Sequence, residues 1–122
     1  MKINQNNSGL AAEKLAATFS MSHGLKLVTQ NYHCRFGEVD LIMMEAKTLV
    51  FVEVKTRTDI VFDKPENAVD GKKQRLMTQA AIAYMAESGH EWAIRFDIVS
   101  IILRGGIFYF DHFEDAFFPG LA

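Results

Sequence analysis

The chain has 122 residues, of which 49% are hydrophobic and 23% charged, a profile typical of one globular domain spanning residues 1–122. No stretch approaches the roughly 18 consecutive apolar residues of a membrane span, and the polar first residues do not resemble a secretory signal, so we expect a cytoplasmic protein without a membrane partner. A single cysteine excludes an internal disulfide. The formal net charge of −2 is unusual for a nucleic-acid-binding protein, so any such binding must be local.

The first half of the chain is predicted to form one helix followed by three strands. Apolar residues recur at four-residue spacing among alanines over residues 10–21, which predicts an amphipathic helix. Residues 25–30 alternate weakly and are expected to form an edge strand. Residues 38–44 and 49–56 are strongly β-prone and are separated by a short polar turn, so they predict an antiparallel hairpin.

The second half begins with a run at 59–69 that is predicted to be an exposed loop. Asp70 is a suitable cap for a helix over residues 71–88, which has an apolar stripe. Residues 96–103 and 107–110 are predicted strands joined by a Gly-Gly turn. The order α, β, β, β, α, β, β indicates an α/β fold with a mixed central sheet flanked by helices.

The register of the central hairpin decides where its charged residues lie. If residues 46–47 form a two-residue turn, Asp40 lies opposite Glu53, and Glu38 lies opposite Lys55. These charged residues then share one face of the hairpin. The other face is apolar and consists of Val39, Leu41, Met43, Val50, Val52 and Val54.

Asp40 and Glu53 are the candidate chemical groups of this hairpin. Carboxylates directly opposite each other are about 5 Å apart and repel, so the pairing requires a cation. Carboxylate oxygens suit Mg²⁺ or Mn²⁺, which retain positions for water and a substrate phosphate, so a phosphodiester is the expected substrate. Lys55 is placed to orient or deprotonate the attacking water. Charges near strand ends are more often solvated, but these interrupt strongly hydrophobic strands, where packing alone favours apolar residues.

Lys72, Lys73 and Arg75 form the densest basic cluster and fall in the first turn of the second predicted helix. Free N–H groups at a helix start favour phosphate, so this cluster is a candidate nucleic-acid contact, with a merely solvated basic face as the alternative. Asp97 is a lone acid in an apolar strand. It is expected to support Lys55, to bind backbone near the sheet end or to be structural, and it receives no catalytic role.

Four segments resemble the uncharacterised YraN-like bacterial family: GEVDLI at 37–42, FVEVKTR at 51–57, KKQRL at 72–76 and RFDIV at 95–99. That family is similar to the PD-(D/E)xK restriction-endonuclease-like nucleases, and especially to archaeal Holliday junction resolvases. The resemblance implies an αβββαβ core and metal-dependent endonucleolytic cleavage of DNA, with branched DNA as one substrate class and a homodimer as the assembly.

The resemblance also assigns roles to single residues. Asp40, Glu53 and Lys55 match the family's catalytic carboxylates and lysine, and the main-chain carbonyl of Val54 matches its usual further metal ligand. Glu13 matches a first-helix glutamate that lies over the metal in resolvase-like members. The alternative for Glu13 is an exposed helix residue paired with a neighbour.

Two departures refine the resemblance. The glycine that usually precedes the first-helix glutamate is Ala12 here, which leaves the approach of that helix to the site open. Gln79 and Tyr84 are one residue too far apart for the helix signature of RecB-type exonucleases, which favours the resolvase-like branch.

Two functions fit these residues, and a third possibility is that the carboxylates form only a structural ion cluster. In the first, Asp40, Glu53 and the Val54 carbonyl hold Mg²⁺, water attacks in line and Lys55 assists, which describes an endodeoxyribonuclease. The alternative is a non-catalytic nucleic-acid-binding or assembly protein that keeps the nuclease fold, since a fold does not establish an activity. The intact acidic residues and lysine favour the enzyme, while turnover itself is left open.

Overall fold

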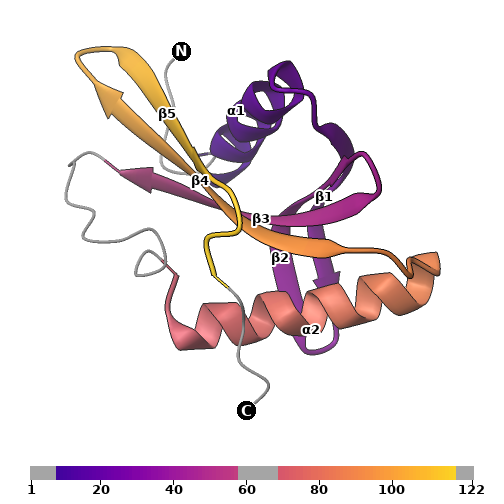
Figure 1. Ribbon diagram of the computed structural model, residues 1–122. Helices are drawn as coiled ribbons and strands as arrows, with labels where there is room; N and C mark the ends of the chain where they lie inside the picture. Colours follow the sequence, from indigo (N-terminus) through magenta and orange to yellow (C-terminus); the bar gives the residue numbers. More distant parts are fainter. Residues whose placement is uncertain (1–7, 58–68, 118–122) are drawn as a thin grey trace.

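The computed structural model describes residues 8–57 and 69–117, which form a five-stranded sheet between two helices (Figure 1). The elements are α1 (Ser8–Ser22), β1 (Lys26–Cys34), β2 (Gly37–Glu45), β3 (Thr48–Arg57), α2 (Gly71–Ser88), β4 (Ile94–Arg104) and β5 (Ile107–Phe113). Their order and the mixed sheet confirm the predicted fold class. Within the described part of the chain, neither helix has the length and apolarity that crossing a membrane demands.

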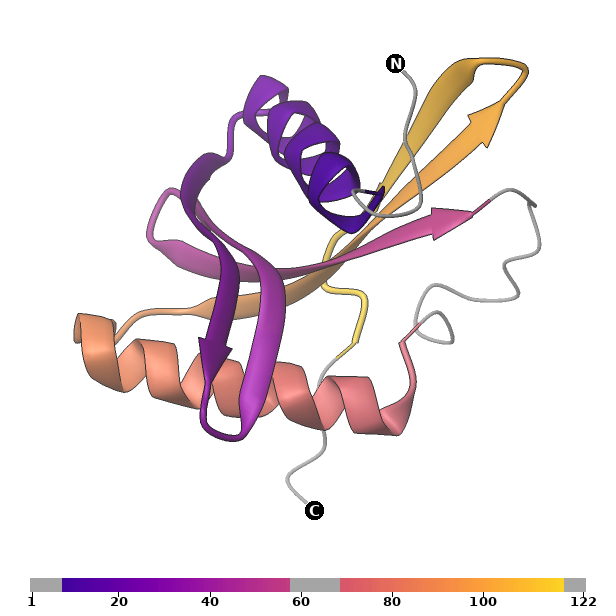
Figure 2. The ribbon, with the colours of Figure 1, turned by 180° about the vertical axis from the view of Figure 1, so that it is seen from behind.

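The sheet has the strand order β1-β2-β3-β4-β5, so β1 lies at an edge as predicted. Neighbouring strands are antiparallel except β3 and β4, which are parallel. A parallel pair needs a crossover connection, and α2 belongs to that connection. The two opposite views show α1 on one face of the sheet and α2 on the other (Figures 1 and 2).

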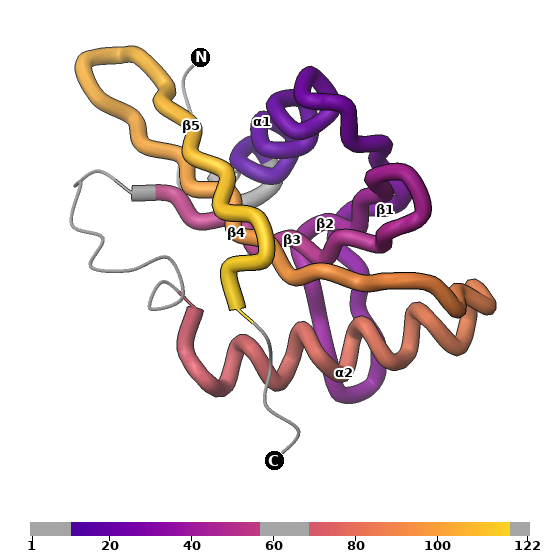
Figure 3. The backbone as a smooth tube through the Cα atoms, in the orientation of Figure 1, coloured from indigo at the N-terminus to yellow at the C-terminus, as the bar shows by residue number. Residues whose placement is uncertain are grey.

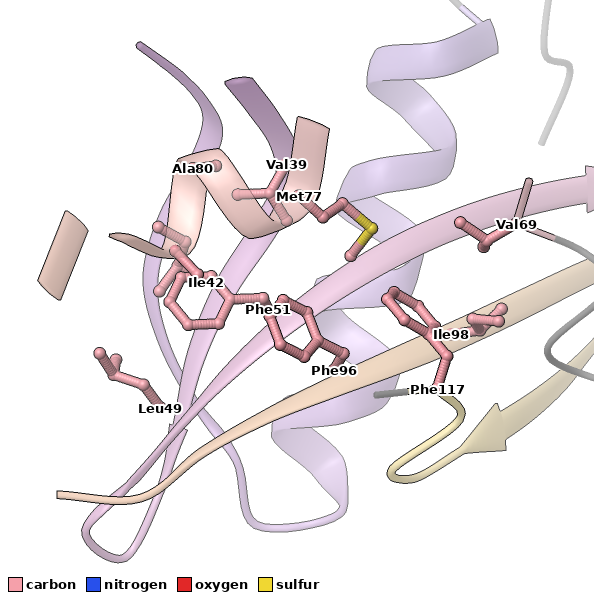
Figure 4. Packing of buried hydrophobic residues seen from close by; sticks show 11 residues of the cluster. Val39, Ile42, Leu49, Phe51, Val69, Met77, Ala80, Phe96, Ile98 and Phe117 are labelled. Carbon is pink, nitrogen blue, oxygen red and sulfur yellow. The ribbon is translucent and has the colours of Figure 1, made fainter. Parts of the chain in front are cut away.

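The sheet divides the interior into two apolar cores. The α2-side core centres on the rings of Phe51 and Phe96, 5.7 Å apart, with Met77 contributed by α2 (Figure 4). The buried members of the α1-side core are Ala12, Ala16, Ala17, Leu25, Leu41, Met43, Val50, Val52, Val99 and Ile101. The alanines of α1 leave room for the helix to lie close to the sheet.

The predicted loop over residues 59–69 needs one correction. Val69 is 2% exposed and belongs to the α2-side core, so the chain is already buried when it reaches the helix. The remainder of this prediction falls on residues 59–68, which lie outside the described residues.

Helix α2 begins and ends at capping residues. Oδ1 of Asp70 accepts a hydrogen bond of 2.8 Å from the main-chain N–H of Lys73, which confirms the predicted cap. Gly89 has a φ of +72° and donates its N–H to the carbonyl of Met85. The first cap fixes Lys73 in the first turn of the helix.

The β2–β3 hairpin has the predicted turn and, close to it, the predicted register. Glu45 pairs with Thr48 around residues 46–47, and the ladder continues until Leu41 pairs with Val52. The ladder ends at that pair, so the backbone pairing expected one step further on, between the two candidate carboxylate residues, does not form. The two strands separate from this point.

Strands β1 and β2 change the faces that they present at Asn31 and Asp40. Leu41 packs in the α1-side core, whereas Val39, two residues earlier, packs in the α2-side core. Asn31 has a φ of +51°, in the left-handed region, and the ladder between the strands skips both Asn31 and Asp40. The expectation that Val39 shares a face with Leu41 is therefore wrong, because strict alternation stops here.

The start of β2 packs directly against the backbone of α2. A Cβ atom added to Gly37 would lie 2.5 Å from the amide nitrogen of Ala80 and 2.5 Å from the carbonyl oxygen of Leu76. Any side chain here would force the strand and the helix apart. Gly37 thus fixes the position of β2 relative to α2.

Candidate active site

The candidate residues gather where β2 and β3 separate. The trace shows β3 continuing between the two helices while β2 runs across α2 (Figures 2 and 3). Oδ2 of Asp40 accepts a hydrogen bond of 2.8 Å from the main-chain N–H of Val54. The Asp40 side chain thus replaces a missing ladder bond between the strands, and this contact fixes its carboxylate at the fork.

Glu53 lies on β3 next to Val54 and is 5% exposed. Its Oε2 atom is 3.3 Å from Nζ of Lys73, yet this ion pair lacks hydrogen-bond geometry, and Oε2 has no hydrogen-bond partner among the described residues. Burial, followed by the charge of Asp40, raises the pKa of Glu53 to about 7, although Lys73 and Lys55 act in the opposite direction. This carboxyl group therefore titrates close to neutral pH.

Glu13 reaches the same region from α1. Its side chain is buried, which excludes the alternative of an exposed helix glutamate. Burial, and then the charge of Asp40, raises the pKa of Glu13 to about 7, and Oε2 of Glu13 has no hydrogen-bond partner in the described chain. Ala12 is 3% exposed within the α1-side core, so an alanine at this position does not keep the helix away from the sheet.

Lys73 contacts the candidate carboxylates directly, although the sequence suggested for it only a place in the basic cluster. Nζ of Lys73 lies 3.2 Å from Oε1 of Glu38 and 3.3 Å from Oε2 of Glu53. Burial opposes its charge, but Glu53 and Asp40 outweigh burial and raise the pKa of Lys73. The side chain of Lys55 is half-buried and makes no ion pair or hydrogen bond within the described residues.

The basic cluster predicted on α2 is thus split. Lys72 and Arg75 are exposed, whereas Lys73 joins Glu13, Asp40 and Glu53 in what we call the acidic site. The signal that sequence reasoning missed is helical spacing: Lys73 precedes the buried Met77 by one turn and so lies on the stripe that faces the sheet.

The acidic site has a donor set suited to a divalent cation. Glu13, Asp40 and Glu53 offer carboxylate oxygens, and two of these oxygens are buried without a hydrogen-bond partner in the described residues. Such hard oxygen donors fit Mg²⁺ or Mn²⁺. Among residues 8–57 and 69–117, no three His, Cys, Asp or Glu side chains already form a metal-binding group.

Asp97 belongs to a different buried cluster, on β4. It is fully buried and accepts hydrogen bonds from Nε of Arg95 at 2.8 Å and from its Nη2 at 2.9 Å, and from the N–H of Asp115 at 2.9 Å. Nε2 of His112 lies 2.7 Å from Oδ2 of Asp97. Burial acts to raise the pKa of Asp97, but these hydrogen bonds outweigh it and lower the pKa. Asp97 is therefore structural, and it binds backbone near the sheet end.

A comparison with known sequences places the chain in a family. The model of the uncharacterised protein family UPF0102 matches residues 12–101, a range that includes the whole acidic site. The chain belongs to this family. The YraN-like resemblance is thereby confirmed.

Relatives in UPF0102 match over most of their length. A UPF0102 protein of Geobacter metallireducens is 36% identical over 118 residues, which cover 96% of this chain and 97% of the relative. One from Caldanaerobacter subterraneus is 40% identical over 104 residues, 84% and 85% of the two chains. One from Psychromonas ingrahamii is 42% identical over 96 residues, 79% of each. Neither the family description nor these names give a biochemical activity.

Proposed function

We propose that this UPF0102 protein is a divalent-metal-dependent endonuclease that hydrolyses DNA phosphodiester bonds. The observation that supports it is the pair of buried carboxylate oxygens, on Glu13 and Glu53, that lack a hydrogen-bond partner in the described structure. Burying carboxylates is costly unless each is fully compensated, and the ion pair of Lys73 with Glu53 does not compensate Glu13, so a protein shaped by stability alone would replace such groups with apolar ones. Their presence around Asp40 favours a site that a cation completes.

The residues of the acidic site have distinct parts in this proposal. Glu13, Asp40, Glu53 and the carbonyl of Val54 would hold Mg²⁺ or Mn²⁺, which when bound supplies Lewis acidity and neutralises charge on the phosphate. The Val54 N–H keeps Asp40 in place at the fork. Lys55, whose ammonium is unpaired in the described structure, is available to orient the attacking water and to offset charge on the scissile phosphate.

Substrate binding is proposed to use the start of α2. Lys72 and Arg75 are exposed there, close in sequence to Lys73 of the acidic site. Free N–H groups at a helix start attract phosphate, and the two cations add to that attraction. DNA is the proposed partner, with branched DNA as one class to test. A homodimer remains a prediction, which size-exclusion chromatography with light scattering would check.

The testing experiment is cleavage of labelled linear, flapped and four-way-junction DNA with Mg²⁺ or Mn²⁺. We compare the wild type with Glu53→Gln and Lys55→Gln, and use the exposed residues in Glu91→Gln and Lys26→Gln as matched controls. Cutting should require metal and fall by about 100-fold or more in both site variants, while the controls keep wild-type rates. Cutting that survives Glu53→Gln would exclude the acidic site as its source.

A non-catalytic nucleic-acid-binding protein is the second candidate. It is favoured by the ion pairs of Lys73 with Glu38 and Glu53, which balance part of the acidic charge without a metal. It predicts DNA binding by fluorescence anisotropy that needs no metal, is unchanged in Glu53→Gln and weakens when Lys72 and Arg75 are replaced by Gln. That result together with no cleavage of any substrate would replace the enzyme proposal.

A further inference from the structure

Lys73 is built into the acidic site by the fold. Its side chain is 21% exposed, and its ammonium lies between Oε1 of Glu38 and Oε2 of Glu53, at 3.2 and 3.3 Å. The Asp70 cap fixes the helical turn that bears Lys73, and the contact of Gly37 with α2 fixes β2 beside it. The ammonium is therefore a resident cation of the site, in contrast to the exposed charges of its neighbours on the helix.

Lys73 also contacts a carboxylate that a divalent cation would need. Oε2 of Glu53 is buried, lies 3.3 Å from Nζ of Lys73 and has no hydrogen-bond partner in the described structure. A Mg²⁺ ion binds carboxylate oxygens at about 2.0–2.1 Å, so occupancy of Glu53 by both cations would leave them only a few ångströms apart. Like charges at that separation repel strongly in a buried site.

Lys55 provides an internal comparison. Its charge also acts on Glu53, as the lowering effect on the Glu53 pKa shows, but it makes no ion pair with that carboxylate. Lys55 thus influences Glu53 through its charge alone, whereas Lys73 also contacts the carboxylate directly. Only Lys73 has to move if a second cation is to take its place at Glu53.

We propose that Lys73 is the resident counter-ion of Glu53 and that a divalent cation displaces it from this carboxylate. This inference rests on the proposed metal-dependent function. In the metal-free state Lys73 holds Glu53 and Glu38 together and offsets part of the charge of the carboxylates. On metal binding, the ammonium of Lys73 moves away from Glu53, while its backbone stays in the first turn of α2. Lys73 is thus a positioning residue, which sets the affinity of the site for metal.

Calorimetric titration with Mn²⁺ tests the exchange. Lys73→Met and Lys55→Met each remove one positive charge near Glu53, but only Lys73 contacts its carboxylate. We expect Lys73→Met to tighten Mn²⁺ binding by about tenfold or more, clearly beyond the effect of Lys55→Met. Equal or weaker binding in Lys73→Met, with wild-type binding still abolished by Glu53→Gln, would overturn the exchange and leave the proposed metal site intact.

A second measurement needs no substitution of Lys73. The side-chain NH₃⁺ resonance of Lys73, followed by NMR in the wild type during Mg²⁺ titration, should shift as the ammonium leaves Glu53, whereas Lys72 should not respond. In Glu53→Gln the Lys73 resonance should no longer follow the metal. A resonance that stays fixed in wild type while Mg²⁺ binds would refute displacement. Absence of any Mn²⁺ or Mg²⁺ binding in wild type and both lysine variants would instead refute the proposed function and this inference with it.

Discussion

Two carboxyl groups on neighbouring strands of this sheet are almost equally buried and yet differ in their hydrogen bonds and in the direction of their pKa shifts. Asp97 on β4 is 0% exposed and Glu53 on β3 is 5% exposed. Both oxygens of Asp97 accept hydrogen bonds, and its pKa is lowered. Glu53 keeps an oxygen without a hydrogen-bond partner in the described structure, and its pKa is raised. The two acids are therefore distinguished by how completely hydrogen bonds satisfy their buried oxygens, and not by how deeply they are buried.

The difference arises from what each strand places nearby. Arg95 lies two residues before Asp97 on the same strand and binds it with two nitrogens, the strongest arrangement for a carboxylate. Glu53 has only the ion pair with Lys73, and burial together with the charge of Asp40 outweighs that ion pair and disfavours its ionised form. A folded chain tolerates such a cluster at a cost in stability, and a bound cation would remove that cost.

The largest expected effect is the loss of stability on replacing Asp97, the acid whose oxygens are hydrogen-bonded. Asp97→Asn should lower the free energy of unfolding by about 3–5 kcal/mol, because it removes the buried charge that pairs with the partly buried guanidinium of Arg95 and accepts the N–H of Asp115. Urea denaturation followed by circular dichroism measures this. Asp111→Asn, at an exposed position on β5, is the control and should stay within about 0.5 kcal/mol. A loss below about 1 kcal/mol for Asp97→Asn would remove the basis of the comparison.

Added metal should stabilise the protein through Glu53. At a Mn²⁺ concentration about 100 times the dissociation constant, the wild type should gain about 2.7 kcal/mol of unfolding free energy, because only the folded chain presents the site. Glu53→Gln should abolish the gain, as measured by thermal unfolding with and without Mn²⁺. A gain that persists in this variant would place the metal elsewhere.

The contributions of the acidic-site glutamates and of Asp97 to stability should change with pH in opposite directions. Glu13 and Glu53 titrate at about 7 in the folded protein, above the ordinary value of 4.5, so the folded state binds more protons between these values. Their contribution to stability is therefore greatest below pH 4.5 and falls as the pH rises to 7. The lowered pKa of Asp97 has the reverse effect, because its contribution is present above its ordinary pKa and is lost as the pH falls.

Urea unfolding from pH 4 to pH 8 measures these slopes. The stability of wild type minus that of Glu53→Gln should decrease with rising pH, whereas that of wild type minus Asp97→Asn should not. Parallel curves for the two differences would show that the acids are equivalent, contrary to their contacts.

The smallest effect is expected for Glu53→Gln in metal-free protein at pH 8. Removing the buried charge relieves desolvation and repulsion from Asp40, which offsets the lost ion pair with Lys73. Unfolding free energy should change by no more than about 1 kcal/mol, or rise. Denaturation in the presence of a chelator checks this, and a loss above about 2 kcal/mol would mean that Glu53 is as structural as Asp97.

Sequence patterns were sufficient for the elements and for the hairpin register near its turn, because alternation and capping are local. The switch of faces at Asn31 and Asp40 was not predictable in the same way, since alternation assumes an unbroken strand and a positive φ at Asn31 has no unambiguous signal. The fork and the contact of Asp40 with Val54 occur at the same place, so they were not predictable either.

The partners of the buried acids also depended on long-range packing. Arg95 was visible two residues from Asp97, but His112 and Asp115 come from the end of the chain, where no local rule pairs them with β4. The placement of Lys73 required knowing which face of α2 meets the sheet. The metal, the substrate and the dimer remain predictions, because they concern molecules that a single chain does not specify.

The contact of Gly37 with α2 makes the length of the chain at the start of β2 important. With this glycine pressed against the helix backbone, the short interval of chain that follows determines how far from α2 the Asp40 carboxylate lies. Lengthening that interval by one residue would shift either the glycine or the aspartate out of place, and it would also exchange the cores into which the flanking side chains point. Related chains should therefore differ by substitution, and not by insertion, between Gly37 and Asp40.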